Sequence, residues 1–287
     1  MNGIRDFIKG MLIGIANIIP GVSGGTMAVS MGIYDKLIHS LTNLKKEFKE
    51  SIRFLLPILL GAGAAIVALS FVITFLLKEY PLETNFAFIG LIVGGLPAIC
   101  KNIKNTKGKK ISVANILALL IFFGIVVGMA LMGDAKSAAA DISFSFSNVL
   151  ILFGVGIIAA ATMVIPGVSG SMILMLLGYY EPVISSIKEF IQSLVHMDGQ
   201  GILTGCGILI PFGLGAVFGI FAIAKIIEII FTKWPLVAYF AIIGLIIASP
   251  IAIMLLSAVT TIGVMNVIIS IITFIAGTLV AYKLGGE

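Results

Sequence analysis

Charge is what this sequence has least of. Charged residues make up only 11% of the 287 positions, whereas hydrophobic residues make up 60%. Soluble domains carry roughly 25% charged residues, and the mean hydropathy of this chain is +1.20. The composition therefore excludes a soluble globular protein and predicts an integral membrane protein. The net charge of +5 is small and lies in short loops, which indicates membrane topology and argues against nucleic-acid binding.

Metal-ligating side chains are scarce as well. The two cysteines, Cys100 and Cys206, lie in apolar stretches, where small buried hydrophobes are expected in place of a disulfide or a metal site. The two histidines, His39 and His196, are too few for a metal cluster. We therefore expect neither a metal nor a cofactor.

One short motif occurs twice. Pro20–Gly25 and Pro166–Ser171 share the string Pro-Gly-Val-Ser-Gly and lie 146 residues apart. The likeness continues at the same offset, and it pairs Gly32 with Gly178, Tyr34 with Tyr180 and Asp35 with Glu181. A Gly/Pro-broken apolar segment at matching positions of two halves is typical of the binding site in transporters built from repeats.

The apolar blocks between the charges predict an all-α polytopic membrane protein. A spanning helix needs about 20 apolar residues, and six blocks fit one span each: 54–77, 84–100, 111–133, 202–224, 236–256 and 261–282. The two segments that carry the motif, 8–34 and 147–180, are predicted to be re-entrant hairpins of two half-helices. A helix from Ser23 to Tyr34 would be about 18 Å long, near half of the ~30 Å hydrocarbon core. The alternative is an ordinary kinked span.

The repeat extends beyond the hairpins, because Pro57 and Pro211, Pro81 and Pro235, and Gly90 and Gly244 all lie 154 residues apart. We therefore predict two repeats, 1–140 and 141–287, within one membrane domain. Each repeat holds a hairpin and three spans, and this odd number of spans inverts the second repeat relative to the first. The Lys-rich loops 41–53 and 101–110 share a side, which the positive-inside rule makes the cytoplasm. Both termini are then expected on the cytoplasmic side of the cell membrane.

The motifs have the chemistry of an anion site. Each is expected to open a half-helix, and helix N-termini offer unpaired N–H groups and about half a positive charge. Opposed hairpins would bring the two motifs close together near the midplane. Glycines allow close backbone approach and hydroxyls add donors, which suits a phosphate without a costly lysine in the bilayer. The candidate binding residues are Asn17, Gly21, Ser23, Gly24, Gly25, Thr26, Gly167, Ser169, Gly170 and Ser171.

Two alternatives stay open at these positions. The small residues may serve only close helix packing, as Gly and Ser do in membranes, and Asn17 is either an amide ligand or a tie between helices. Asp35 and Glu181, at the expected ends of the second half-helices, are either interfacial carboxylates or a pair of proton carriers that couple transport to the proton gradient. Lys225 and Glu228, three residues apart, are predicted to neutralise each other at a membrane edge.

The segments Ile18–Asp35, IIPGVSGGTMAVSMGIYD, and Val164–Glu181, VIPGVSGSMILMLLGYYE, resemble the two signature segments of the bacterial and archaeal polyprenyl-phosphate transporters. The resemblance covers essentially the whole chain. It implies translocation of undecaprenyl phosphate or a related polyprenyl phosphate across the cytoplasmic membrane, which recycles the lipid carrier for cell-wall synthesis. Its implied partners are that lipid and the bilayer. Many members carry an Asp shortly before the first Pro-Gly, where this chain has Asn17.

Two other classes of function compete with lipid transport. A small-anion channel or exchanger also uses Gly-Ser-rich loops, but it needs an aqueous funnel in place of an apolar groove that opens to the lipid. Undecaprenyl-pyrophosphate phosphatases carry a similar Pro-Gly-x-Ser-Arg-Ser motif. Phosphoryl transfer requires cationic clamps and carboxylate-held metal, whereas this chain has Gly24 and Gly170 at the Arg position and no acidic pair inside a membrane block. We therefore expect a protein that is not an enzyme.

Overall fold

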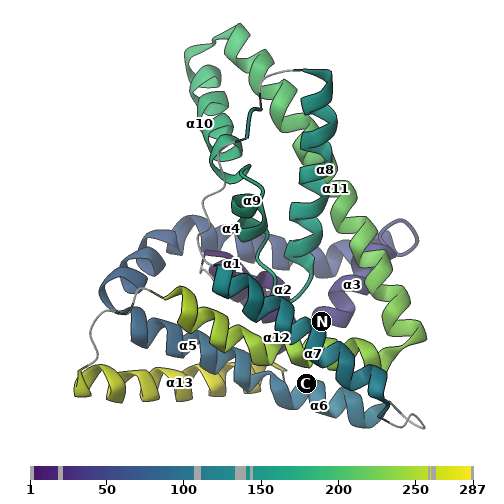
Figure 1. Ribbon diagram of the computed structural model, residues 1–287, viewed down its shortest axis with the longest axis vertical. Helices are drawn as coiled ribbons and strands as arrows, with labels where there is room; N and C mark the ends of the chain where they lie inside the picture. The colour runs from purple at the N-terminus through teal and green to yellow at the C-terminus, as the bar shows by residue number, and fades with distance from the viewer. Residues whose placement is uncertain are drawn as a thin grey trace. The chain divides into compact units, whose positions relative to one another are not determined.

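The computed structural model describes residues 3–18, 22–106, 111–132, 140–142, 145–257, 259 and 263–285. These residues form helices joined by turns, and no strand occurs among them, so the all-α prediction is confirmed (Figure 1). The helices are α1 (Gly3–Ile18), α2 (Gly24–Ser30), α3 (Tyr34–Thr42), α4 (Phe48–Glu79), α5 (Pro81–Gly94), α6 (Leu96–Asn105), α7 (Val113–Met132), α8 (Phe146–Val164), α9 (Gly170–Leu176), α10 (Tyr180–His196), α11 (Gly199–Lys233), α12 (Pro235–Leu256) and α13 (Val264–Gly285).

Within the described residues, seven segments are long and apolar enough to cross a membrane: α4, α5 with α6, α7, α8, α11, α12 and α13. The sequence predicted six spans, and the seventh is α8, which we had assigned to half of a hairpin. Its 19 residues form an unbroken apolar helix that ends only two residues before Pro166. The count rises to eight if α9 and α10, which meet at 107°, are taken as one broken span. The chain is thus a multi-pass helical membrane protein.

The helix after the first motif is shorter than predicted. We expected it to run from Ser23 to Tyr34, but α2 holds only seven residues. The reason is Gly32, whose φ of +66° is left-handed. Its N–H bonds to Val29 O at 2.9 Å, and the N–H of Ile33 bonds to Ala28 O at 3.0 Å. This Schellman arrangement closes the helix and satisfies its last carbonyls.

The second copy ends in the same way. Gly178 has a φ of +77°, and the N–H of Tyr179 bonds to Leu174 O at 2.9 Å. Because both short helices stop early, Asp35 and Glu181 do not end them, as we had predicted. Asp35 is the second residue of α3, and Glu181 is the second residue of α10.

The chain divides into two compact units. Unit 1 comprises Met1–Leu131, Ile165–Val168 and Ala224–Glu287, and unit 2 comprises Met132–Val164 and Ser169–Ile223. In unit 1 the most extensive contacts are those of α1 with α4 and of α5 with α13, which lie side by side in Figure 1. The division into repeats at residue 140 concerns internal symmetry and stays a prediction.

Glycines bring helix backbones into direct contact at equivalent places in the two units. A Cβ on Gly61 of α4 would lie 2.1 Å from Phe7 O of α1. In unit 2, a Cβ on Gly215 of α11 would lie 2.0 Å from Phe153 O of α8. Gly61 and Gly215 are 154 residues apart, and Phe7 and Phe153 are 146 apart, which are the offsets of the sequence repeat. Small residues at such crossings let membrane helices pack closely.

Candidate functional site

The first motif lies in unit 1 and is held by its own polar groups. Ser23 caps α2, and its Oγ accepts from Thr26 N at 3.1 Å and lies 3.0 Å from Thr26 Oγ1. Gly24 N donates to Asn17 Oδ1 at 2.9 Å, so Asn17 ties α1 to α2. All seven residues of α2, including Gly25, are buried. Gly21 lies outside the described residues.

A residue of the second motif reaches this cluster. Gly167 N donates to Thr26 Oγ1 at 2.6 Å and to Ser23 Oγ at 3.0 Å. Gly167 belongs to unit 1, has a φ of +77°, and would bring an added Cβ within 3.1 Å of Leu245 Cβ. The two strings, 146 residues apart in sequence, therefore share hydrogen bonds at this point. We name Ser23, Thr26 and the Gly167 N–H the first donor set.

The rest of the second motif lies in unit 2. Ser169 caps α9, its Oγ accepts from Met172 N at 3.5 Å, and it lies 2.9 Å from Ser171 Oγ. Gly170 N has no acceptor among the described residues, because Met163 stands 146 residues after Asn17 and offers no amide oxygen. We name the two hydroxyls and the Gly170 N–H the second donor set.

Helices α1 and α2 run antiparallel. Lys9 Nζ, near the start of α1, donates to Met31 O, at the end of α2, over 3.2 Å. The hydrogen bond between Gly24 and Asn17 joins their opposite ends. Lys9 is only 7% exposed, and a cation beside the last carbonyls of a helix is favoured by the helix dipole. The sequence gave Lys9 only a role in topology, so this contact was missed.

Asp35 lines a cavity of about 450 Å³ within unit 1. Its Oδ2 accepts from Tyr239 OH at 3.0 Å, and Ile38 and Phe231 form part of the apolar wall. Desolvation by the surrounding protein raises the pKa of the Asp35 carboxyl above its ordinary 3.8, and the hydrogen bond from Tyr239 opposes this shift. Glu181, the counterpart of Asp35, is an exposed residue of unit 2.

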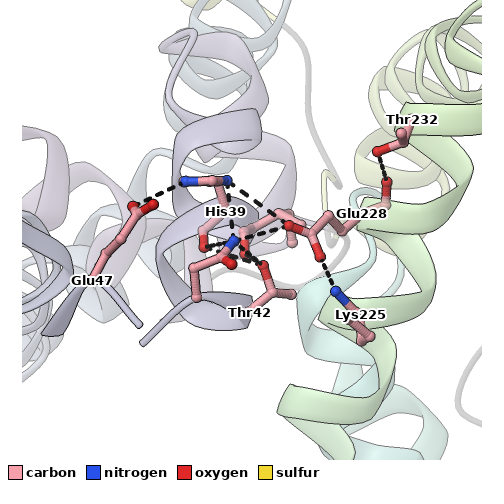
Figure 2. A network of polar contacts seen from close by, with 8 residues as sticks. His39, Thr42, Glu47, Lys225, Glu228 and Thr232 are labelled. Atoms are coloured by element: carbon pink, nitrogen blue, oxygen red, sulfur yellow. Dashed lines mark hydrogen bonds and ion pairs between the residues drawn. The ribbon is translucent and has the colours of Figure 1, made fainter. Parts of the chain in front are cut away.

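A polar network borders the same cavity (Figure 2). Lys225 Nζ donates to Glu228 Oε2 at 2.5 Å, which confirms the predicted pair. Glu228 Oε1 also accepts from Asn43 Nδ2 at 3.0 Å and lies 3.8 Å from His39 Nδ1, while His39 Nε2 is 3.2 Å from Glu47 Oε2. His39 therefore contacts these acids, and the network ties α3 to the end of α11.

One acidic residue was missed altogether. We placed Glu83 in a loop, but it lies in the first turn of α5 and is 5% exposed. Pro81 at the first helical position was the available signal, because proline is favoured there. Among the described residues, no group of three or more His, Cys, Asp or Glu side chains is arranged to hold a metal ion.

The fold and the site define a class: a multi-pass α-helical membrane protein with two short, glycine-bounded helices that follow a repeated Pro-Gly motif. Within that class, the chain belongs to the family described as undecaprenyl phosphate translocase-like, which its residues 13–270 match.

Two relatives carry a function in their names. A polyprenyl-phosphate transporter of Staphylococcus aureus is 31% identical over 282 residues, which cover 98% of this chain and 95% of that protein. A polyprenyl-phosphate transporter of Vibrio cholerae is 32% identical over 222 residues, which cover 72% of this chain and 66% of that protein. No solved structure matches the chain.

Proposed function

We propose that this chain translocates undecaprenyl phosphate, or a related polyprenyl phosphate, across the cytoplasmic membrane and so recycles the lipid carrier. The observation that carries the proposal is the hydrogen bonding of the Gly167 N–H to the hydroxyls of Ser23 and Thr26, by which one motif meets the other. The names of the two relatives support the lipid class.

The donor sets suit a phosphate headgroup. Moving a bare ion through hydrocarbon costs tens of kcal/mol by Born solvation, whereas the lipid tail can remain in the bilayer. Hydroxyl and N–H donors replace the water lost by the phosphate, and hydrogen bonds to a charged acceptor are about twice as strong as neutral ones. In the first donor set, a phosphate oxygen would take the Gly167 N–H, and the hydroxyls of Ser23 and Thr26 would turn toward it. Each donor set is proposed to contact the headgroup at one stage of transport.

The proposed topology has two inverted repeats, re-entrant segments and cytoplasmic termini. The antiparallel pairing of α1 and α2 supports a hairpin that returns to its own side. Arg5 Nη2 donates to Lys283 O at 3.2 Å, and this contact between the first and last helices supports termini on one face. The glycine crossings at equivalent positions support two related halves.

Proton coupling is the further part of the proposal. Asp35 lines a cavity, and desolvation raises the pKa of its carboxyl, which favours uptake of a proton near neutral pH over an ordinary Asp. Glu181 is proposed as its counterpart in unit 2. Replacement of both by their amides, Asp35→Asn with Glu181→Gln, should abolish the response of transport to an imposed pH gradient.

The test is a proteoliposome assay with a fluorescent polyprenyl phosphate and a membrane-impermeant quencher. The wild type should expose lipid of the inner leaflet to the quencher, and Ser23→Ala combined with Thr26→Val should slow this exposure at least tenfold. The matched control is Thr204→Val, which removes a hydroxyl that only bonds Gln200 O of its own helix. A labelled polyprenol without phosphate should not move.

Two outcomes would overturn the proposal. Chloride efflux without lipid movement would favour the small-anion channel or exchanger. Release of inorganic phosphate from undecaprenyl pyrophosphate would instead make the chain a phosphatase.

A further inference from the structure

A carboxyl group is buried inside the membrane-spanning part of unit 1 without a counter-charge. Glu83 is 5% exposed, and its Oε1 accepts from Asn266 Nδ2 at 2.7 Å. Its Oε2 has no hydrogen-bond partner among the described residues, and neither has Ser270 Oγ on α13, which is 2% exposed. Two buried oxygens on the packed helices α5 and α13 are thus left unsatisfied, which is costly in a medium of low dielectric.

The polar face of α13 is oriented toward this carboxyl group. Asn266, Ser270 and Thr273 are spaced four and three residues apart and so share one side of the helix. Asn266 Oδ1 accepts from Gly263 N at 3.2 Å, which directs its Nδ2 to Glu83. Thr273 Oγ1 donates to the Glu83 backbone oxygen at 2.8 Å. The side-chain donor nearest Glu83 is therefore already in use on Oε1, and Oε2 has none.

No cation of the protein compensates the carboxylate. The titratable groups on the helices that pack against α5 lie elsewhere along them: Lys78, Glu79 and Tyr80 at the end of α4, Cys100, Lys101 and Lys104 on α6, Tyr239 on α12, and Tyr282 and Lys283 on α13. None of these described groups forms an ion pair or hydrogen bond with Glu83. The partial positive charge at the start of α5 offsets only part of the cost of burying a charge.

The helix itself does not require an acid at this position. Helix α12 begins with Pro235-Leu236-Val237, at the 154-residue offset from Pro81-Leu82-Glu83 of α5. Valine thus occupies the place of Glu83 in the related helix, which also starts with proline at its first position. Carboxylates buried in membrane helices commonly mark ion or proton sites.

We propose that Glu83 Oε2 and Ser270 Oγ form the binding site of a small monovalent cation, H⁺ or Na⁺, which is taken up and released during transport. The role in transport rests on the proposed function, whereas the binding of the cation does not. A bound proton converts the carboxylate to a neutral carboxyl group whose O–H can donate, and Na⁺ accepts the two oxygens as ligands. Because Glu83 is in the first turn of α5, the cation has a short path from that end of the helix.

The test is cation binding to the purified full chain in detergent, with no lipid substrate. Two signals are recorded: saturable binding of radioactive ²²Na⁺, and the infrared carbonyl band of a protonated carboxyl group as pH is changed. Glu83→Gln is expected to weaken Na⁺ binding at least tenfold if the cation is Na⁺, or to remove the carbonyl band if it is H⁺. The matched control is Glu79→Gln, an exposed carboxylate nearby that should leave both signals unchanged.

Ser270→Ala keeps the charge and provides a second variant in case Glu83→Gln does not fold. It should weaken Na⁺ binding or shift the pH at which the carbonyl band appears. The proposal is overturned if both variants fold and neither signal differs from the wild type. Binding of the labelled polyprenyl phosphate is measured in the same samples. Wild-type protein that binds the cation but neither binds nor moves the lipid would refute the proposed function alone.

Discussion

The two copies of the repeated motif use the same residues for different contacts. In the first copy, Asn17 accepts from Gly24 N, and the hydroxyls of Ser23 and Thr26 accept from Gly167 N. Every residue of α2 is buried. In the second copy, Met163 replaces Asn17, the hydroxyls of Ser169 and Ser171 contact each other, and only Gly170 of the seven residues in α9 is buried.

The difference follows from a few neighbouring side chains. An amide before the first motif and a threonine within it provide acceptors for N–H groups, and these positions hold Met163 and Met172 in the second copy. The polar groups of the first copy therefore stabilise unit 1, whereas the Gly170 N–H of the second copy has no acceptor among the described residues. We expect substitutions in the first copy to act mainly on stability and those in the second to act mainly on headgroup binding, except at Gly170.

The largest effect is expected for Gly170→Val. An added Cβ would lie 2.4 Å from Met163 Cγ and 2.8 Å from Ala159 O, so α9 must move away from α8. Overpacking of this kind costs about 3 kcal/mol. The measurement is the thermal unfolding midpoint in detergent. Loss of transport in this variant therefore does not by itself indicate a phosphate site.

The comparison with the first copy comes from Gly24→Ala and Gly170→Ala. At Gly24, the nearest atoms to an added Cβ are side-chain atoms of Asn17 and Ile13, both at 3.0 Å, which can shift. Gly170→Ala should therefore lower the unfolding midpoint more than Gly24→Ala does. The opposite order would refute the packing difference between the copies.

The second prediction concerns the hydroxyl groups. Ser23→Ala combined with Thr26→Val leaves the buried N–H of Gly167 without an acceptor, which should cost about 2 kcal/mol of stability. Ser169→Ala combined with Ser171→Ala removes a pair that mainly contacts itself, so its cost to stability should be smaller. Chemical denaturation gives the free energy of unfolding, and titration with labelled polyprenyl phosphate gives the affinity. Equal losses of stability in both double variants would contradict the proposed division between the copies.

Sequence alone identified the apolar helices and the motif, because hydropathy and a repeated string are local signals. The length of α2 was also within reach, since Gly32 and Gly178 occur at equivalent positions, but we did not use them as helix ends. Glu83 was missed because a charged residue was taken as the edge of a span. The bond of Gly167 to Thr26 could not be predicted, because it joins segments 141 residues apart and depends on tertiary packing.

The third prediction exchanges a residue of the first copy for its counterpart. Asn17→Met introduces the residue of the second copy and removes the acceptor of the Gly24 N–H, which should cost about 1 kcal/mol. Asn17→Asp retains an oxygen acceptor and should be less destabilising. The unfolding midpoints of the two variants provide the measurement. A variant Asn17→Met as stable as the wild type would show that the tie between α1 and α2 contributes little.

The smallest effect is expected at Asp35, and it depends on pH. Desolvation raises the pKa of this carboxyl in the folded protein above the 3.8 of an ordinary Asp. The unfolded chain therefore loses its proton at lower pH than the folded chain, so ionisation favours unfolding. Below 3.8 both states are protonated and there is no cost. As pH rises from 3.8 through the raised pKa, wild-type stability should fall relative to Asp35→Asn, and the difference should then stay constant. Tyr239→Phe removes the hydrogen bond that lowers the Asp35 pKa, so it should extend the decline to higher pH. Unfolding midpoints measured across this pH range test both variants. A stability difference between wild type and Asp35→Asn that does not change with pH would refute the shift, and with it the advantage of Asp35 as a proton carrier.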